Sequence, residues 1–443
     1  MKSNSLQDSV RNAGVVGAGG AGFPTHVKIS AKVEIVIANG AECEPLLRVD
    51  QQIMAKFAEK VVSGIAKVRG ATGAKRAIIA LKKKYKSAWS ELEKHAKKFG
   101  VELFPLGSFY PAGDEVTLVY EVTGRVIPEA SLPMNVGCLV QNVHTLCWID
   151  DADSGAPVTE RYVTVGGAVR HPTTFLAPIG TPVSDLIEKA GGASVENYVI
   201  IDGGPMMGKF VELTHSITKR TSGILLFPTE HPYVKKRMES MRISWNKAAA
   251  ACTSCEDCTK YCPRYLLGHR VLPHRAMRAS AFALEPPPME GFALTGAICC
   301  ECGICTLWSC PMDLRPREVM QAVKRKMAEN KIQNPFRGET GSIHPSIADR
   351  KIPVERIVQG LHLTEWDVEA PMATEILLPK TVKIPLSQHV GAPARAVVKE
   401  KSKVKKGDLI GEIPESALGA RVHASIDGVV TKVSDVVEIK SEL

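Results

Sequence analysis

The 443-residue sequence has no uninterrupted apolar run close to the roughly 20 residues that a membrane-spanning helix needs. Residues 1–14 lack the apolar centre of a secretion signal, so we expect a cytoplasmic protein without a membrane span. Aromatic residues make up only 5%, and the net charge is only +9. The lysine-rich stretches 82–84 and 399–406 contain no aromatic residues, so we interpret them as solvated surface and expect no nucleic-acid partner.

At roughly 150 residues per domain, a chain of this length predicts about three domains. With 44% hydrophobic and 23% charged residues, it has the composition of a globular protein. This composition excludes a collagen-like chain, a disordered chain and a miniature protein held together by disulfides.

Cysteine is the most informative residue type in the chain. Of the 12 cysteines, nine lie between positions 252 and 310. They form two runs, each with three cysteines at C-x2-C-x2-C spacing followed by a Cys-Pro pair, as in bacterial two-cluster ferredoxins. In that pattern the fourth ligand of each cluster comes from the other run. We therefore predict one [4Fe–4S] cluster held by Cys252, Cys255, Cys258 and Cys310, and a second held by Cys262, Cys299, Cys302 and Cys305.

Zinc is the alternative metal, because zinc sites also use cysteine pairs. Two triplets that each lead to a Cys-Pro pair are not a zinc spacing, and we favour iron–sulfur chemistry. Cys300 breaks the ligand spacing, so we expect it to be a neighbour of a cluster and not a ligand. Cys43, Cys138 and Cys147 lie far from both runs, and we interpret them as buried structural thiols.

A glycine-rich segment, VVGAGGAG, covers residues 15–22 and is followed by Phe23, Pro24 and, a little later, Lys28. Glycines let backbone N–H groups approach a phosphate closely, and a nearby lysine adds positive charge. The match to the dinucleotide fingerprint is superficial, since a proline follows the glycines and no acidic residue closes the unit. On local grounds, a glycine-rich loop without a ligand remains an alternative.

The following residues alternate between strand-like and helix-like patterns, which predicts an α/β domain. Strands are expected at 33–38, 76–81 and 101–105, and helices at 50–69 and 87–98. Polar segments at 39–45, 110–115 and 141–145 follow strands or lie in turns, where ligand-binding groups gather.

These segments carry a resemblance to known families. GAGGAGFPTHVK, NGAECEP, YPAGDE and QNVHT resemble, in the same order, the flavin-binding segments of the NADH-binding flavoprotein subunit of respiratory complex I. The C subunits of Rnf electron-transport complexes are more similar. The phrases AGVVGAGGAGFPTHVK, DGGPMMGKF and ALGARVHASIDGVV identify the chain as similar to the cobalamin reductases of propanediol-utilisation microcompartments.

The resemblance implies a binding site for FMN and NADH. It assigns the flavin phosphate to Gly17, Gly19, Gly20 and Lys28, and the ribityl or phosphate end to Asn142 and Thr145. The sides of the flavin ring are assigned to Asn39, Glu42 and Cys43. The nicotinamide side is assigned to Tyr110, Gly113, Asp114 and Glu115, and further NADH contacts to Phe23 and Glu44. Ala18, Ala41 and Cys43 depart from the complex I pattern, which has an arginine, an acidic residue and a serine there. These departures weaken the implied assignment of the NADH site more than that of the flavin site.

The implied fold is multidomain, α/β plus α+β. We expect a Rossmann-like FMN/NADH-binding domain at 1–155, a β-grasp (SLBB-like) module at 156–215, a linker at 216–245, a two-cluster ferredoxin module at 246–325, a linker or extension at 326–370 and an all-β barrel-sandwich module at 371–443. The β-grasp module is expected to clasp the flavin domain. The last module shows hairpin turn signals at 405–408 and 426–428, without the modified lysine of lipoyl domains.

The implied activity is that of an NADH-dependent oxidoreductase, in which FMN takes two electrons from NADH and releases them singly to the clusters. No catalytic side chain is needed. The resemblance implies a corrinoid adenosyltransferase or another electron acceptor as partner, contact with microcompartment shell proteins, and a location inside a bacterial microcompartment. Oligomers are compatible with the sequence. Two alternatives are an Rnf C-like relay without cobalamin specificity or an NADH site of its own, and a non-catalytic iron–sulfur scaffold.

Overall fold

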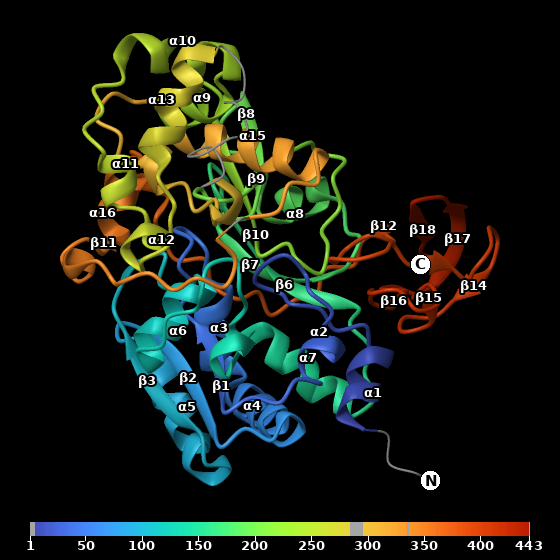
Figure 1. The fold of residues 1–443 in the computed structure, drawn as a ribbon. Helices are drawn as coiled ribbons and strands as arrows, with labels where there is room; N and C mark the ends of the chain where they lie inside the picture. The colour runs from blue at the N-terminus through green and yellow to red at the C-terminus, as the bar shows by residue number, and fades with distance from the viewer. Residues whose placement is uncertain (1–4, 284–295, 335, 443) are drawn as a thin grey trace.

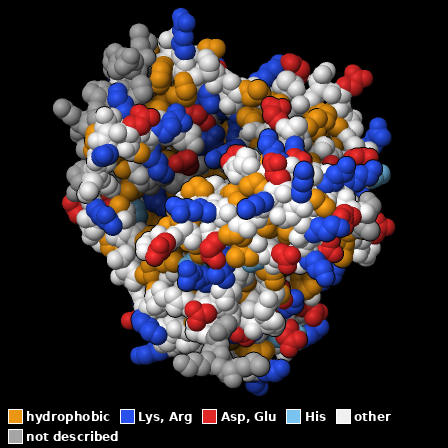
Figure 2. Space-filling model, turned by 90° about the vertical axis from the view of Figure 1, so that its right-hand side faces the viewer, with side chains coloured by type: hydrophobic (Ala, Val, Ile, Leu, Met, Phe, Trp, Pro, Cys, Tyr) orange, Lys and Arg blue, Asp and Glu red, His pale blue; other side chains and the backbone are white. Residues whose placement is uncertain are grey.

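The structure is a computed structural model that describes residues 5–283, 296–334 and 336–442. In Figure 1 the N-terminal α/β region lies at the bottom, the cysteine-bearing helices lie at the top, and the last strands stand to the right. No helix of the described residues is long and apolar enough to span a bilayer. On the face drawn in Figure 2, basic and acidic side chains are interspersed.

The N-terminal region is built on a parallel sheet with strand order β3-β2-β1-β5. Its strands are β1 (Ile35–Gly40), β2 (Arg76–Lys82), β3 (Glu102–Leu106) and β5 (Cys138–Asn142). The helices are α1 (Leu6–Asn12), α2 (Thr25–Lys28), α3 (Val49–Lys56), α4 (Ala58–Thr72), α5 (Lys86–Phe99), α6 (Glu115–Thr123) and α7 (Val143–Asp153), with the short turn η1 (Pro133–Val136) before β5.

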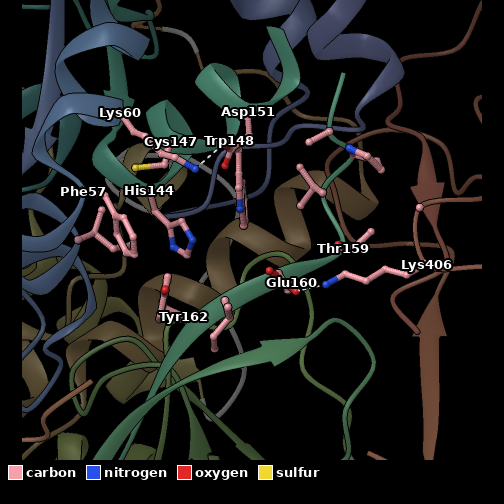
Figure 3. Close-up of a pocket in the computed structure, with 16 residues that line it drawn as sticks. Phe57, Lys60, His144, Cys147, Trp148, Asp151, Thr159, Glu160, Tyr162 and Lys406 are labelled. Carbon is pink, nitrogen blue, oxygen red and sulfur yellow. Dashed lines mark hydrogen bonds and ion pairs between the residues drawn. The ribbon is translucent and has the colours of Figure 1, made fainter. Parts of the chain in front are cut away.

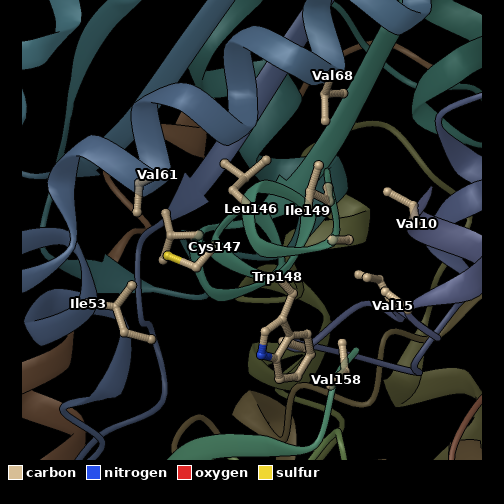
Figure 4. Close-up of a cluster of buried hydrophobic side chains, with 14 of the residues drawn as sticks. Val10, Val15, Ile53, Val61, Val68, Leu146, Cys147, Trp148, Ile149 and Val158 are labelled. Atoms are coloured by element: carbon tan, nitrogen blue, oxygen red, sulfur yellow. The ribbon is translucent and has the colours of Figure 1, made fainter. Parts of the chain in front are cut away.

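Alternate residues of the strands enter two different cores. Val36 and Ala38 pack into the cluster that contains α4 and α7, whereas Ile35 and Ile37 pack into the cluster that contains α6. Both faces of the sheet are therefore covered, which explains why its strands are continuously apolar. Figure 4 shows part of the first cluster around α7, with Trp148 at its edge.

The predicted strands and the helix at 87–98 are confirmed to within two residues at each end. The prediction of one helix at 50–69 is wrong, since the structure has two helices, α3 and α4. The break falls at Phe57, whose φ of −122° and ψ of 36° leave the helical region. The Phe57 ring packs 5.5 Å from the ring of Tyr162, outside the N-terminal region.

The second region is a five-stranded mixed sheet with order β7-β6-β10-β8-β9. Its elements are β6 (Glu160–Gly167), β7 (Thr173–Pro178), α8 (Val183–Lys189), β8 (Tyr198–Asp202), β9 (Lys209–Val211) and β10 (Gly223–Pro228). The central strand β10 lies in the segment 216–245 that we expected to be a linker. Its residues 224–227 are apolar and fully buried between β6 and β8, so this part of the segment belongs to the sheet core.

The cysteine-bearing region is helical, and α10, α13 and α15 share one core. Its elements, with the preceding α9, are α9 (Pro232–Met238), α10 (Met241–Ala251), α11 (Asp257–Lys260), α12 (Pro263–Leu266), α13 (Pro273–Ala283), α14 (Ile304–Leu307) and α15 (Pro316–Glu329). The following extension contains η3 (Pro345–Ile347), β11 (Ile352–Pro353), α16 (Val354–Gly360) and η4 (Thr364–Trp366). Strand β11 pairs with β4 (Phe109–Tyr110), so the extension returns to the N-terminal region.

The C-terminal region consists of two small antiparallel sheets, with orders β12-β18-β17-β14 and β13-β15-β16. The strands are β12 (Thr381–Pro385), β13 (Arg395–Ala396), β14 (Lys403–Val404), β15 (Leu409–Glu412), β16 (Val422–His423), β17 (Gly428–Val433) and β18 (Val436–Lys440).

The turns at 405–408 and 426–428 are present, but the prediction that they close hairpins is wrong. The first joins β14 to β15 and the second joins β16 to β17, and in both cases the two strands belong to different sheets. The turns lie side by side, since Lys406 N donates to Asp427 Oδ1 at 2.6 Å and Gly407 N donates to Ala424 O at 2.8 Å. Local turn chemistry specifies the bend, and sheet packing decides where the strands go.

Candidate functional site

The strand order of the N-terminal sheet creates a candidate ligand site between β1 and β5. The chain runs from β1 outward to β2 and β3, then crosses back to place β5 on the other side of β1. Ligands of open α/β sheets bind at the carboxyl ends of the strands at this kind of reversal. β1 ends at Asn39 and Gly40, and β5 ends at Asn142. The predicted flavin residues on these segments are therefore brought together.

The glycine-rich loop lies over the end of β5. Ala18 N donates to Thr145 Oγ1 at 2.9 Å. A Cβ atom at Gly19 would lie only 2.8 Å from Asn142 Nδ2, whereas a Cβ at Gly20 would meet nothing within 4 Å. Gly19 thus allows the loop backbone to approach the end of the strand, and Gly20 leaves space for a ligand.

A second group forms at the end of β1. Asn39 Nδ2 donates to Gly113 O at 2.8 Å, and Asn39 Oδ1 accepts from Ala41 N at 3.2 Å. A Cβ at Gly113 would lie 3.2 Å from Cys43 Sγ. Burial raises the pKa of the Cys43 thiol to about 12, so the thiol is neutral. Gly113, expected on the nicotinamide side, thus lies against the two residues expected beside the flavin ring.

Lys28 supplies the positive charge of the candidate site. Burial lowers the pKa of Lys28, and the opposing effect of Glu115 shows that this carboxylate lies near it. Phe23, at the end of the glycine loop, is 37% exposed. A lysine near the glycine loop suits the phosphate of a flavin nucleotide.

Three acidic side chains predicted to face the flavin or NADH are engaged by other groups of the protein. Glu42 accepts hydrogen bonds from Asp50 N and Gln51 N at the start of α3, at 2.7 and 3.2 Å. Glu44 accepts from Met206 N at 2.9 Å and from Met207 N at 2.8 Å, in the second region. Asp114 caps α6 and pairs with Arg264, which follows the first cysteine run.

Two residues that the sequence did not single out belong to the site. Asp50 Oδ2 accepts from Asn142 Nδ2 at 2.8 Å, and burial together with the neighbouring Glu42 raises the pKa of Asp50 to about 7. Lys82 Nζ donates to Glu42 O at 3.1 Å, and burial lowers the pKa of Lys82 to about 8. The interpretation of 82–84 as solvated surface is therefore wrong for Lys82, which is 1% exposed. Its position at the end of a buried strand was the available signal.

The first predicted set of iron ligands surrounds one cavity. Cys252, Cys255, Cys258 and Cys310 all line it, together with residues of the intervening loops. Leu314 N donates to Cys310 Sγ at 3.3 Å. Cys255 is exposed, so this cavity lies near the surface of the described structure.

The second set, Cys262, Cys299, Cys302 and Cys305, is more deeply buried. Burial and the neighbouring thiols raise the pKa of Cys305, and those neighbours are Cys299, Cys258 and Cys262. Because Cys258 belongs to the first set, the two sets are adjacent. Cys300 also lies beside Cys302, and a hydrogen bond with that thiol lowers the pKa of Cys300.

The two cysteine runs share left-handed backbone at corresponding positions. Ser254 and Glu256 flank the middle cysteine of the first run with positive φ values of 56° and 67°. Glu301 and Gly303 flank the middle cysteine of the second run with φ values of 59° and 84°. The two triplets thus carry left-handed residues at corresponding positions.

The donor chemistry and arrangement fit iron–sulfur clusters. A [4Fe–4S] cluster takes one thiolate at each of four irons, so its ligands surround a volume. Soft thiolates are the ligands that such clusters require.

Direct contacts join the candidate flavin site to the second cysteine set. Tyr110 is 1% exposed, and its hydroxyl donates to Cys302 O at 2.7 Å. Arg264 Nη2 donates to Asp114 Oδ1 at 2.8 Å. Cys43 packs against the apolar cluster that contains Cys302. The predicted nicotinamide-side residues Tyr110 and Asp114 thus hold the two regions together.

Four family models match successive parts of the chain. They are the Nuo51 FMN-binding domain at 10–151, the SLBB domain at 162–210, a 4Fe-4S dicluster domain at 251–315 and the RnfC barrel sandwich hybrid domain at 356–442. Their order agrees with the expected order of modules.

Similar proteins cover nearly the whole chain. The cobalamin reductase PduS of Salmonella typhimurium is 40% identical over 98% of this chain and 96% of its own length, and that of Citrobacter freundii is 39% identical over 98% and 95%. The Na⁺-translocating ferredoxin:NAD⁺ oxidoreductase complex of Acetobacterium woodii has a C subunit that is 36% identical over 60% of this chain and 59% of its own. The structure of an NAD⁺-reducing [NiFe]-hydrogenase shares the fold, with a TM-score of 0.50 and 20% sequence identity. The match covers 74% of this chain and 62% of the hydrogenase chain.

Proposed function

The chain belongs to the family of the cobalamin reductase PduS, and on that basis we propose that it is an NADH-linked reductase that delivers single electrons to a corrinoid. The matched FMN-binding and 4Fe-4S dicluster domains supply the two kinds of redox group that this activity requires. FMN when bound accepts a hydride from NADH, and the clusters carry single electrons.

The chain's own residues would hold these groups as follows. The loop 17–22 and Lys28 would meet the flavin phosphate, and Asn39, Cys43 and Gly113 would line the flavin ring. The two cysteine sets would hold the clusters as predicted. These roles rest on the convergence of the loop, Asn142 and Thr145 at the β1–β5 reversal.

The observation that carries the proposal is the hydrogen bond from Tyr110 to Cys302 O. It joins the candidate flavin site to the second cysteine set. The second set is in turn adjacent to the first set through Cys305 and Cys258. Since Cys255 of the first set is exposed, we place the exit to an external acceptor there.

We further propose the finer assignments that the family suggests. The parallel sheet would be a Rossmann-like domain, the mixed sheet a β-grasp module and the paired small sheets a barrel-sandwich module. The acceptor would be a corrinoid bound to an adenosyltransferase, and the protein would work inside a bacterial microcompartment, in contact with shell proteins.

The first test is the composition of protein purified without oxygen. We expect about eight iron and about eight sulfide ions per chain, with about one FMN. Lys28→Gln should lower the FMN content without changing iron, whereas the exposed Lys83→Gln should change neither. Stoichiometric zinc in place of iron, or a full flavin content in Lys28→Gln, would contradict the assignments.

The second test is the order of the clusters. In Cys255→Ser, NADH should still reduce the flavin and the second cluster, but cobalamin reduction should fall at least tenfold. In Cys302→Ser, which removes a ligand of the second cluster, the first cluster should stay oxidised on the time scale of turnover. Cys138→Ala, outside both sets, serves as the control. Rapid reduction of the first cluster in Cys302→Ser would reject the proposed order.

A relay without its own NADH site is the second candidate, and one observation favours it. The carboxylates of Glu44 and Asp114, expected to face NADH, are occupied by Met206, Met207 and Arg264. Anaerobic mixing with NADH distinguishes the two candidates. Bleaching of flavin absorbance within the turnover time supports the reductase, and no bleaching until reduced ferredoxin is added supports the relay.

A further inference from the structure

A cavity of about 460 Å³ lies between α7, β6 and the turn at Lys406 and Gly407, and none of its lining residues belongs to the two cysteine runs (Figure 3). Its volume is within the range of small-molecule sites in proteins. The walls come from three regions of the chain, the N-terminal domain, the mixed sheet and the C-terminal sheets. Junctions of this kind commonly hold ligands.

Four aromatic rings form one end of the cavity. The His144 and Trp148 ring centroids are 4.6 Å apart, those of His144 and Tyr162 are 6.1 Å apart, and those of Phe57 and Tyr162 are 5.5 Å apart. Figure 3 shows the His144 ring directed toward the space between Trp148 and Tyr162. Such walls favour a flat ring, because aromatic faces and edges stack on planar partners.

His144 is a buried polar group that the protein does not satisfy. The residue is 3% exposed, and its Nδ1 atom has no hydrogen-bond partner among the described residues. Burial and Arg161 lower the pKa of His144 well below its ordinary value, so the imidazole is neutral and carries one donor and one acceptor. Buried polar atoms without partners are uncommon in native structures and call for a ligand or water.

The charged groups of the cavity are already paired. Lys60 Nζ lies 2.5 Å from Asp151 Oδ1, and Lys406 forms an ion pair with Glu160. Each cation that lines the cavity therefore faces a carboxylate. This balance favours an uncharged ligand over an anion such as a phosphate.

The cavity is separate from the candidate flavin site. His144, Cys147, Trp148 and Asp151 follow helical spacing and share one face of α7, which lines the cavity. Thr145 instead accepts its hydrogen bond from Ala18 in the glycine-rich loop. The helix thus presents different residues to the two sites.

From these observations we propose that the cavity binds a flat, uncharged heteroaromatic molecule that hydrogen-bonds with the His144 imidazole. The aromatic walls favour a planar molecule, the paired charges favour an uncharged one, and the unsatisfied histidine favours a ring that carries a hydrogen-bonding heteroatom, such as nitrogen. The site does not depend on the assignment of the flavin or of the clusters.

The test compares benzimidazole with indene, a hydrocarbon of the same shape without nitrogen. Calorimetric titrations use the complete protein loaded with FMN, so that the flavin site is occupied. We expect benzimidazole to bind at least about tenfold more tightly than indene, the difference that one satisfied buried hydrogen bond makes. Equal affinities, or no binding of either compound, would overturn the proposal.

Variants locate the binding. His144→Phe keeps an aromatic ring but removes both nitrogens, and it should reduce benzimidazole affinity to that of indene. His95→Phe on α5, outside the cavity, should leave the preference unchanged. If His144→Phe does not fold, Trp148→Leu provides the second variant and should weaken both compounds. A preference that survives in folded His144→Phe, or unchanged affinities for both compounds in Trp148→Leu, would place the binding elsewhere and reject the site.

Discussion

Glu44 shows at the scale of one residue how the burial of a carboxyl group serves two regions at once. It lies in the loop after β1, yet its carboxyl group accepts hydrogen bonds from the backbone N–H groups of Met206 and Met207 in the mixed-sheet region. Burial raises the pKa of Glu44 to about 7, although these two hydrogen bonds act in the opposite direction. The group therefore titrates near neutral pH.

The pKa of Glu44 predicts a loss of stability as the pH rises. Because the folded pKa lies above the ordinary value of 4.5, the contribution to stability is complete below about pH 4.5 and is lost as the pH rises through about 7. The size of this loss is on the order of 3 kcal/mol. Thermal unfolding of the anaerobic protein should therefore show a lower midpoint at pH 8 than at pH 5.

In Glu44→Gln this difference in midpoint should shrink markedly, because the amide does not titrate. The exposed Glu230→Gln, whose partner is Lys235 at the surface, is the matched control and should keep the wild-type pH dependence. An unchanged pH dependence in Glu44→Gln would show that the carboxyl group does not titrate as described.

The cysteine loops are the informative feature at the scale of an element. Gly303 takes a φ of 84° beside Cys302, and a Cβ there would lie 2.9 Å from Arg317 Nη1 and 3.1 Å from Met206 O. Arg317 is itself fixed, because it donates to Met206 O at 2.6 Å and pairs with Glu318. The loop therefore has little room to adjust.

The variant Gly303→Ala should lose iron from the second cluster. It carries the cost of a left-handed L-residue, about 1–2 kcal/mol, and the clash with Arg317 and Met206 in addition. Gly338→Ala is the matched control, since its φ is 85° and nothing lies within 4 Å of its Cβ position. Iron and sulfide analysis should show a loss for Gly303→Ala alone. Equal iron contents in the two variants would refute the role of close packing.

At the scale of the whole molecule, a buried lysine joins three regions. Lys219 Nζ donates to Gly14 O at 2.7 Å in the N-terminal region and to Arg421 O at 2.8 Å in the C-terminal sheets. Lys219 itself lies between β9 and β10 of the mixed sheet, and the residue is 1% exposed. The C-terminal strands also share an apolar core with the N-terminal domain, through residues such as Ile384 and Val10.

Removing this lysine should loosen the C-terminal sheets. In Lys219→Met, the carbonyls of Gly14 and Arg421 lose their donor, at a cost of about 1–3 kcal/mol for each buried group left unsatisfied. Limited proteolysis should then cut residues 371–443 several times faster than in the wild type. Lys189→Met, which removes a surface pair with Glu375, is the control. The same cleavage rate in both variants would contradict the joining role.

Features that depend on local spacing and backbone conformation could be predicted from the amino-acid order alone. Two cysteine triplets with their Cys-Pro pairs specify the ligand sets, and the structure gathers the first set around one cavity. The glycine loop and the alternation of strands and helices likewise follow from short-range patterns. Such features depend only on residues that are close together in the sequence, so a short segment is enough to predict them.

Which distant groups meet became clear only from the packing of the folded chain. That packing buried Lys82, directed Glu44 and Asp114 to other regions, sent the strands after the predicted turns into different sheets, and formed the aromatic cavity around His144. These outcomes depend on elements far apart in the chain. The sequence does not show whether a carboxylate or a lysine is solvated by water or hydrogen-bonded to a buried backbone group. The burial of the side chain in the folded structure decides which of these partners it has.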